Sequence, residues 1–376
     1  MKKGFTLIEL VVAVGILAMM LGFTSVIFNV SIKGSRVVNA NAEIMQKLRA
    51  VTDQLDGDLR GLDKNAPLLI WFEKTSNALD DPNTRFDQIM FFVTGDFKST
   101  QLYSNKPSNY INTPVDADKE DPTCVYKRGN AARIYYGQAQ RDSVNTADVN
   151  DTPSKRILCR RRQFFTCDER IEKWPVWNVN LSDFERDPNG YMCNDRYEHD
   201  SLSLEQWTFV KENAFSRDNG VVDVVFEKRP EVKLSAPNTY HDFLSEEVAS
   251  FKIQWAYWNP DNNPKDDKLR WFPCDDPEKD GLAAHSHFRI NAANKFGVYF
   301  NVADHTYDGF SVNSNQWYPV DDGNLNKIIY NYKKANNNYF ENDFYPKALK
   351  FTFTIYDSKG IIKDGRTFSH IVYLGE

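Results

Sequence analysis

The hydrophobic positions of this 376-residue chain are concentrated in one unbroken run close to its start. Apolar residues dominate residues 5–30, and the only charged residues up to position 30 are Lys2, Lys3 and Glu9. At a rise of about 1.5 Å per residue, such a run forms a helix that can cross a hydrocarbon core of about 30 Å. The pattern predicts a transmembrane helix over 5–30, with the two lysines on the cytoplasmic side.

A second, amphipathic pattern continues this helix. Apolar residues recur at helical spacing, with charged residues such as Lys47 and Asp53 between them. The pattern ends at Asn65-Ala66-Pro67, because the residue before a proline disfavours helical backbone. We therefore expect a helical spine over 31–62 that packs on a folded domain through one stripe: Val37, Ile44, Leu48, Val51, Leu55, Leu59 and Leu62.

Beyond the spine, residues 63–376 alternate between short strand patterns and turn-rich polar segments. Large apolar residues occupy every second position in 251–257 and 349–355, as in half-buried strands. The pattern predicts an α+β fold, in which the long helix packs on an antiparallel sheet. Long surface insertions are expected at 104–130, 138–205 and 259–345. The expected strands are 68–73, 88–94, 132–136, 206–211, 221–228, 250–258, 347–356 and 366–374.

The composition is that of a mostly polar chain with one apolar segment. The chain is 41% hydrophobic, but its mean hydropathy of −0.57 shows that the apolar run is a local exception.

The motifs argue against an enzyme. No GxGxxG, Walker A, GxSxG or HExxH pattern occurs. His285-Ser-His287 is a weak metal hint, and ordinary histidines are the favoured interpretation. An anchored enzyme remains the alternative of a different class, and hydrolysis by the folded domain would support it.

Two kinds of charged segment suggest ligands. Asp116–Asp121, Asp261–Asp267 and Asp304 with Asp308 offer hard oxygen ligands for calcium but lack EF-hand spacing, so solvated turns are favoured. Lys155–Arg162 with Phe164-Phe165 combines basic and aromatic residues, as single-strand nucleic-acid sites do. The net charge of −6 favours instead a strand whose basic face meets solvent or an acidic partner, and no nucleic acid is expected.

The five cysteines form an odd set, Cys124, Cys159, Cys167, Cys193 and Cys274. In an extracytoplasmic domain they could form up to two disulfides and leave one thiol. Cys159 and Cys167 have the separation of a hairpin cross-link and are the preferred pair. Five free thiols are the alternative.

The stretch Lys2-Lys3-Gly4-Phe5-Thr6-Leu7-Ile8-Glu9 resembles the class III leader of type IV pilins and pseudopilins. The resemblance implies that residues 1–4 are a leader, that prepilin peptidase cuts after Gly4, and that the new Phe5 amine is methylated. An ordinary secretory signal is the alternative. Its expected cleavage pattern occurs only at Ala40-Asn41-Ala42, well beyond the apolar run.

Glu9 places a carboxylate inside the predicted transmembrane helix. An acid at the centre of a spanning helix costs about 2.5–3.5 kcal/mol on insertion scales, so such residues usually have a partner. The resemblance implies that Glu9 pairs with the Phe5 amine of a neighbouring subunit during assembly. The alternative is that Glu9 reaches the cytoplasmic headgroups.

Further segments resemble the J-type minor pseudopilins of type II secretion. They are Leu55-Asp-Gly-Asp58-Leu-Arg60, the stretch 243–258, the stretch 346–353 and the closing 368–374. The resemblance implies a structural subunit near the tip of a pseudopilus, which helps to prime assembly for protein export. Its expected partners are I-type and K-type minor subunits, the major pseudopilin and the inner membrane, with a periplasmic head.

No cofactor is expected, although some pseudopilins bind calcium. The second interpretation is a minor pilin of a type IV pilus, with a role in pilus priming, adhesion or DNA uptake.

Overall fold

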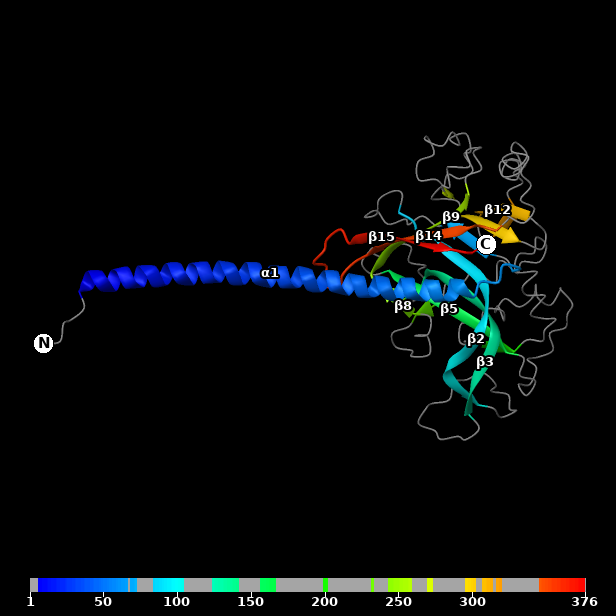
Figure 1. The fold of residues 1–376 in the computed structure, drawn as a ribbon, viewed down its shortest axis with the longest axis horizontal. Coiled ribbons are helices and arrows are strands. Elements are labelled where there is room, and N and C mark those ends of the chain that lie inside the picture. The colour runs from blue at the N-terminus through cyan, green and yellow to red at the C-terminus, as the bar shows by residue number, and fades with distance from the viewer. Residues whose placement is uncertain are drawn as a thin grey trace.

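The protein is a long helix that runs into a β-rich head, with the C-terminus in the head (Figure 1). It is seen in a computed structural model that describes residues 6–66, 68–72, 84–104, 124–141, 156–166, 199–201, 231–232, 243–258, 269–272, 295–301, 306–313, 316–319 and 345–375. The helix together with largely antiparallel sheets confirms the predicted α+β, pilin-like class.

Helix α1 spans Leu7–Arg60, and its 54 residues make it about 81 Å long at about 1.5 Å per residue. The predicted helix, 5–62, was two residues too long at each end. Gly61 explains the C-terminal end: a Cβ there would lie 2.6 Å from the carbonyl oxygen of Thr94. The chain turns at this glycine into contact with the sheet, and Leu62 forms a β-bridge with Val93 instead of a last helical turn.

The larger sheet has nine strands among the described residues, in the order β13-β12-β11-β1-β2-β3-β5-β6, with β8 also paired to β5. All its strand pairs are antiparallel except β5 with β6. Its strands are β1 (Leu68–Phe72), β2 (Gln88–Ser104), β3 (Cys124–Gln138), β5 (Ile157–Thr166), β6 (His199–Ser201), β8 (Phe243–Glu246), β11 (Lys295–Asn301), β12 (Thr306–Asn313) and β13 (Gln316–Pro319).

A second sheet, antiparallel throughout, has the order β10-β9-β14-β15. Its strands are β10 (Leu269–Phe272), β9 (Val248–Trp258), β14 (Ala348–Ile355) and β15 (Arg366–Tyr373). Burial alternates along β14: Phe351 and Phe353 are buried, while Thr352 and Thr354 lie on the outer face. A short parallel pair, β4 (Gln140–Arg141) with β7 (Glu231–Val232), completes the described strands.

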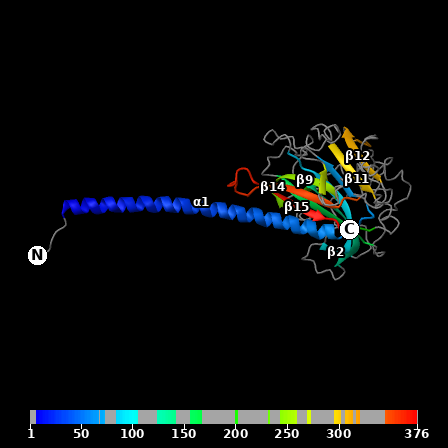
Figure 2. The same cartoon turned by 45° about the horizontal axis from the view of Figure 1, so that its top comes forward.

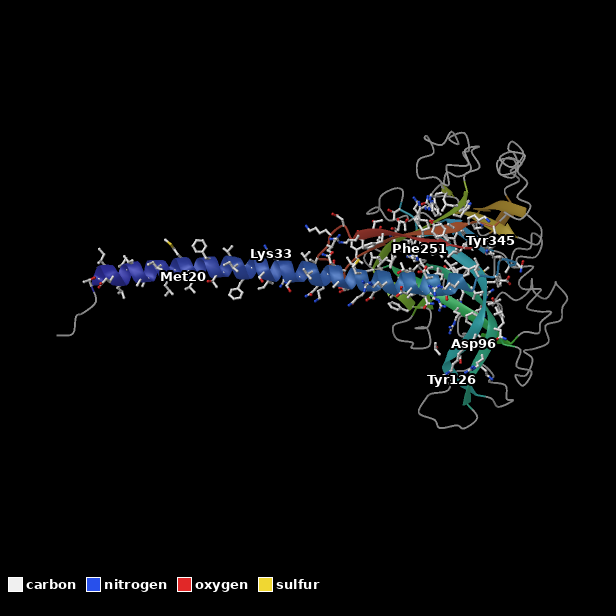
Figure 3. The ribbon with its side chains drawn as sticks, viewed as in Figure 1. Met20, Lys33, Asp96, Tyr126, Phe251 and Tyr345 are labelled. Carbon is white, nitrogen blue, oxygen red and sulfur yellow. The ribbon has the colours of Figure 1, made fainter. Side chains whose placement is uncertain are left out.

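Three residues before β2 connect the two sheets. The Asp87 backbone N–H donates to the carbonyl of Phe251 in β9 at 2.7 Å, and the Phe251 N–H donates to the carbonyl of Arg85 at 3.1 Å. The Asp87 carboxylate, fully buried, accepts from the Ile253 backbone N–H at 2.8 Å and from the Arg85 guanidinium at 2.9 Å. The two sheets therefore share one hydrophobic core, in which Phe251 lies (Figure 3).

The second half of α1 packs into this core. Ile44, Val51, Leu55 and Leu59 are buried there together with side chains of both sheets, and the predicted stripe members Leu48 and Leu62 are partly buried against it. Val37, the first member of the predicted stripe, lies outside this core. It is 44% exposed, and Ala40 is the first buried residue along α1. Figure 2 shows the same separation of helix and head from a second direction.

Segments expected to be surface insertions supply strands of both sheets. β5 lies inside the predicted insertion 138–205, and β10 to β13 lie inside 259–345. The predicted strands at 68–73, 88–94, 132–136, 250–258, 347–356 and 366–374 all exist, and β2 and β3 are much longer than expected. The predicted strands 206–211 and 221–228 lie outside the described residues.

Candidate processing and assembly site

The described residues begin at Thr6, and both residues of the predicted cut site, Gly4 and Phe5, lie outside them. Thr6 is the N-cap of α1, with extended backbone at φ −79° and ψ 148°. Its hydroxyl accepts the Glu9 backbone N–H at 3.4 Å. The Glu9 carboxylate accepts the Thr6 backbone N–H at 3.0 Å and the Thr6 hydroxyl at 2.9 Å. The two residues form a capping box, which satisfies backbone donors at the helix start.

This geometry gives Glu9 a contact that the sequence analysis missed. The Glu9 carboxylate accepts hydrogen bonds from Thr6, at the start of the same helix. A Thr followed three residues later by Glu, just before an apolar run, is the sequence signature of such a cap. Capping and charge are therefore two separate properties of Glu9.

The first half of α1 projects its apolar side chains into the surroundings. Leu7, Met20 and Phe23 are 83%, 64% and 71% exposed, and side chains stand out on all sides of this segment (Figure 3). Within the described residues, α1 is the one helix long and apolar enough to cross a membrane, and its most apolar stretch is not buried. A helix segment that is apolar all round, and that no described part of the head covers, fits a membrane anchor.

The other end of α1 is held by a buried carboxylate. Asp58 accepts two bonds from the Arg160 guanidinium of β5, from Nε to Oδ2 and from Nη2 to Oδ1, both at 2.6 Å. The Tyr136 hydroxyl donates to the same carboxylate, as does the Gln54 amide at 3.1 Å. Burial, followed by the Asp58 charge, raises the pKa of Tyr136 well above its ordinary value, so its hydroxyl keeps the proton it donates.

The arginines of the predicted basic cluster make hydrogen bonds within the head and to α1. Arg156, fully buried, donates to the Ala249 carbonyl at 2.6 Å, and Arg162 donates to the Lys98 carbonyl at 3.0 Å. Together with Arg160, these side chains bond within the chain. The cluster does lie on a strand, as the favoured interpretation required, but the acid it meets is Asp58 of the same chain.

A second polar contact holds α1 where it enters the head. The Lys47 ammonium bonds Glu43 at 2.8 Å, the carboxylate of Glu247 and the carbonyl of Tyr356 at 3.4 Å. Glu43 also accepts the backbone N–H of Ser358 at 2.9 Å and its hydroxyl at 3.0 Å. Burial works against the charged ammonium, but the bonds to both carboxylates outweigh it and raise the pKa of Lys47.

Other predicted ligand groups fall mainly outside the described residues. The Cys159 thiol is buried and donates to the Gly137 carbonyl at 3.2 Å, whereas its predicted disulfide partner Cys167 lies outside. His285, His287 and the acidic segments 116–121 and 261–267 also lie outside. Within the described ranges, no group of three or more His, Cys, Asp or Glu side chains could hold a metal ion.

Comparisons with known proteins identify the N-terminus. Residues 1–25 match the family described as the prokaryotic N-terminal methylation motif. No curated protein and no solved structure matched the chain. The motif implies processing by prepilin peptidase and assembly into a filament with other pilin subunits. It covers the capping box and most of the exposed apolar stretch of α1, and it marks the N-terminus of this chain as type IV pilin-like, a kind that includes the pseudopilins.

Proposed function

We propose that this protein is a J-type minor pseudopilin, a non-enzymatic subunit near the tip of a type II secretion pseudopilus that helps to prime its assembly. One observation carries the proposal. The methylation motif at 1–25 includes the start of a 54-residue helix whose first half is exposed and apolar and whose second half is held in a large head. That arrangement provides a lipid anchor and a rigid spine in one element.

The charges give the orientation of this anchor. Lys2 and Lys3 precede the apolar run, so the N-terminus stays in the cytoplasm and the head lies in the periplasm. Prepilin peptidase then cuts between Gly4 and Phe5 on the cytoplasmic side. The mature chain begins with a methylated Phe5, and the apolar run is retained.

Assembly uses the parts of α1 that the head leaves exposed. The Glu9 carboxylate pairs with the Phe5 amine of a neighbouring subunit, which compensates two charges in lipid. Val37, Val38 and Met45 are 44%, 65% and 42% exposed beyond the apolar run, and they pack against neighbouring helices.

The J-type assignment is supported by where the resembling segments lie. The end of α1, with Asp58, packs against the core to which β9 and β14 contribute. β9, β14 and β15 are direct neighbours in one sheet. Segments that are far apart in the sequence thus form one contiguous unit. We propose that this unit contacts I-type and K-type minor subunits, and that a head of this size caps the filament and is not repeated along it.

The test is deletion of the gene, followed by complementation with the wild-type chain. Loss of enzyme release into the medium, with twitching and transformation unchanged, supports the proposal. The opposite result would assign the protein to a type IV pilus as a minor pilin. Co-purification of the full chain with two other minor subunits would support the tip position, and recovery with the major subunit alone would contradict it.

A further inference from the structure

The connection between β14 and β15, residues 356–365, extends from the head back along α1 toward the apolar half of the helix. Of the described parts of the head, it reaches furthest in that direction (Figures 1 and 2). We call it the tip loop. Hydrogen bonds fix its position beside the helix, since Ser358 donates to Glu43 through both its backbone N–H and its hydroxyl.

The tip loop has a defined internal structure. Asp357 is buried, and its carboxylate accepts the backbone N–H groups of Ile361 at 2.9 Å and Ile362 at 2.8 Å. Gly360 and Gly365 adopt positive φ angles of 62° and 63°, which other residues rarely do. The loop therefore presents a fixed set of side chains at its end.

Those side chains have the chemistry of a lipid interface. The sequence at the end of the loop is Lys359-Gly360-Ile361-Ile362-Lys363, in which both lysines are exposed and Ile361 is half-buried. Asp364 is an exposed acid beside them, whereas the charge of Asp357 is turned inward onto backbone donors. Lysines on either side of an apolar residue suit the boundary between anionic headgroups and water.

The helix also carries exposed positive charges on the side of the head toward which the tip loop extends. Lys33 and Arg36 are exposed and are the first charged residues after the apolar run, and Lys33 is visible on the bare stretch of α1 before the head (Figure 3). With the apolar run placed in the hydrocarbon core, these two residues fall in or near the headgroup layer, on the side toward which the tip loop extends.

We propose that the tip loop is held close to the anionic headgroups of the membrane that holds α1 by electrostatic attraction, and so orients the head before assembly. The inference depends on the membrane anchoring proposed above. Glu43, which holds Ser358, lies about 20 Å along the helix from Val30 at about 1.5 Å per residue. The headgroup layer occupies about 5–8 Å of this distance.

The remaining distance is short enough for electrostatic attraction. Subtracting the headgroup layer leaves about 12–15 Å from the level of Glu43, and the tip loop extends beyond this level toward the apolar half of α1 (Figures 1 and 2). The remaining gap is of the order of one Debye length, about 8 Å at physiological ionic strength. Lys359 and Lys363 therefore act on phosphate groups at close range, and the attraction is lost when the subunit leaves the bilayer.

The experiment uses the full chain in liposomes of phosphatidylcholine with about one third phosphatidylglycerol. A fluorescent amino acid is placed at position 361, and lipids with a nitroxide on the headgroup act as quencher. The same probe at Ser369, on the outer face of β15, is the reference. We expect at least twofold stronger quenching at 361 than at 369, and loss of that difference in the Lys359→Glu/Lys363→Glu variant or in pure phosphatidylcholine.

A matched control reverses two exposed cations of the head, Lys98→Glu and Arg128→Glu, and should leave quenching at 361 unchanged. Equal quenching at 361 and 369, in protein that stays in the bilayer after alkaline extraction, would overturn this inference and leave the proposed anchoring intact. Release of the wild-type chain by alkaline extraction would overturn both.

Discussion

Asp58 in the last turn of α1 and Arg160 in β5 are 102 residues apart in the sequence, yet they share two parallel bonds of 2.6 Å. Both side chains are largely buried, with 7% and 14% exposure. Removing one member leaves the other as an uncompensated buried charge, which costs far more than an exposed ion pair contributes.

We expect Arg160→Met to lower the free energy of unfolding by about 3–5 kcal/mol. Arg160→Lys should recover only part of this loss, because an ammonium cannot make the bidentate contact. The measurement is chemical unfolding of the full chain in detergent, followed by near-ultraviolet circular dichroism. Arg128→Met is the control: its pair with Asp96 is 3.9 Å apart and both side chains are mostly exposed, so stability should hardly change.

The boundary of the docked part of α1 makes a second prediction. Leu55 is fully buried in the shared core, so Leu55→Ala should cost about 2–5 kcal/mol of unfolding free energy. Val37→Ala, on the exposed part of the helix, should change it by less than about 0.5 kcal/mol. The same unfolding assay measures both. A large loss for Val37→Ala would mean that the head covers more of the helix than described.

The tip loop should make stability depend on pH. Burial alone would raise the pKa of Asp357, but backbone N–H groups, those of Ile361 and Ile362 first, outweigh it and hold the pKa below its usual value. A lowered pKa in the folded state stabilises the fold above the unfolded value of about 3.9, and this contribution is lost as pH falls through the folded value.

Asp357→Asn should therefore cost about 1 kcal/mol near pH 7, where the wild-type carboxylate is charged. The difference from wild type should shrink as the pH falls below the ordinary value of about 3.9 and through the lower pKa of folded Asp357. Unfolding curves of wild type and variant at neutral pH and at acidic pH measure this difference, and Asp364→Asn, at an exposed position, is the control. A cost that stays the same at both pH values would show that charge plays no part.

Processing follows from the motif at 1–25. Gly4→Leu should block cleavage by prepilin peptidase, because the proposed cut lies directly after Gly4 and leucine puts a bulky side chain there. Immunoblots of cells that express the peptidase would show only the longer, uncut chain. Mature-sized protein from this variant would refute the proposed cut site.

The capping box allows the charge of Glu9 to be separated from its role at the helix start. Glu9→Gln keeps a capping side chain and removes the charge, whereas Thr6→Ala removes the cap and keeps the charge. If Glu9 pairs with a neighbouring Phe5 amine, Glu9→Gln should be cleaved but assemble poorly. Thr6→Ala should lose about 1 kcal/mol of helix stability and still assemble.

Cross-linking of neighbouring subunits in the membrane measures that difference. Poor assembly of both variants to the same extent would assign the role of Glu9 to capping. Normal assembly of Glu9→Gln would contradict the proposed pairing of the Glu9 carboxylate with a neighbouring Phe5 amine.

The helix could be predicted from the sequence, because an apolar run and a stripe of period 3.6 depend only on local spacing. β5 could not. Its residues Arg160, Arg161 and Arg162 interrupt any alternation of apolar and polar positions. The strand is nevertheless buried because the carboxylate that compensates Arg160 comes from the end of α1, and no local pattern records a partner that distant.

In the candidate site, too, contacts between residues close in the sequence could be predicted and contacts between distant residues could not. Glu9 was identifiable because a lone acid in an apolar run is costly and therefore conspicuous. The contact with Thr6 was recoverable from the T-x-x-E spacing, whereas the Lys47 contacts depend on Glu247 and Tyr356, about 200 and 309 residues away. Long-range partners of this kind follow from the fold and not from the spacing.

The way α1 lies in the head determines how the subunit carries mechanical load. From Ile44 to Leu59 one face of the helix is buried over about 22 Å along the helix axis. A pull along that axis, such as extraction from a bilayer requires, loads all of these contacts in shear at once. The Lys47 and Asp58 ion pairs, at the two ends of the buried stretch, oppose sliding in the same direction. A force on the anchor is thus transmitted to both sheets together, and it cannot peel the helix away one turn at a time.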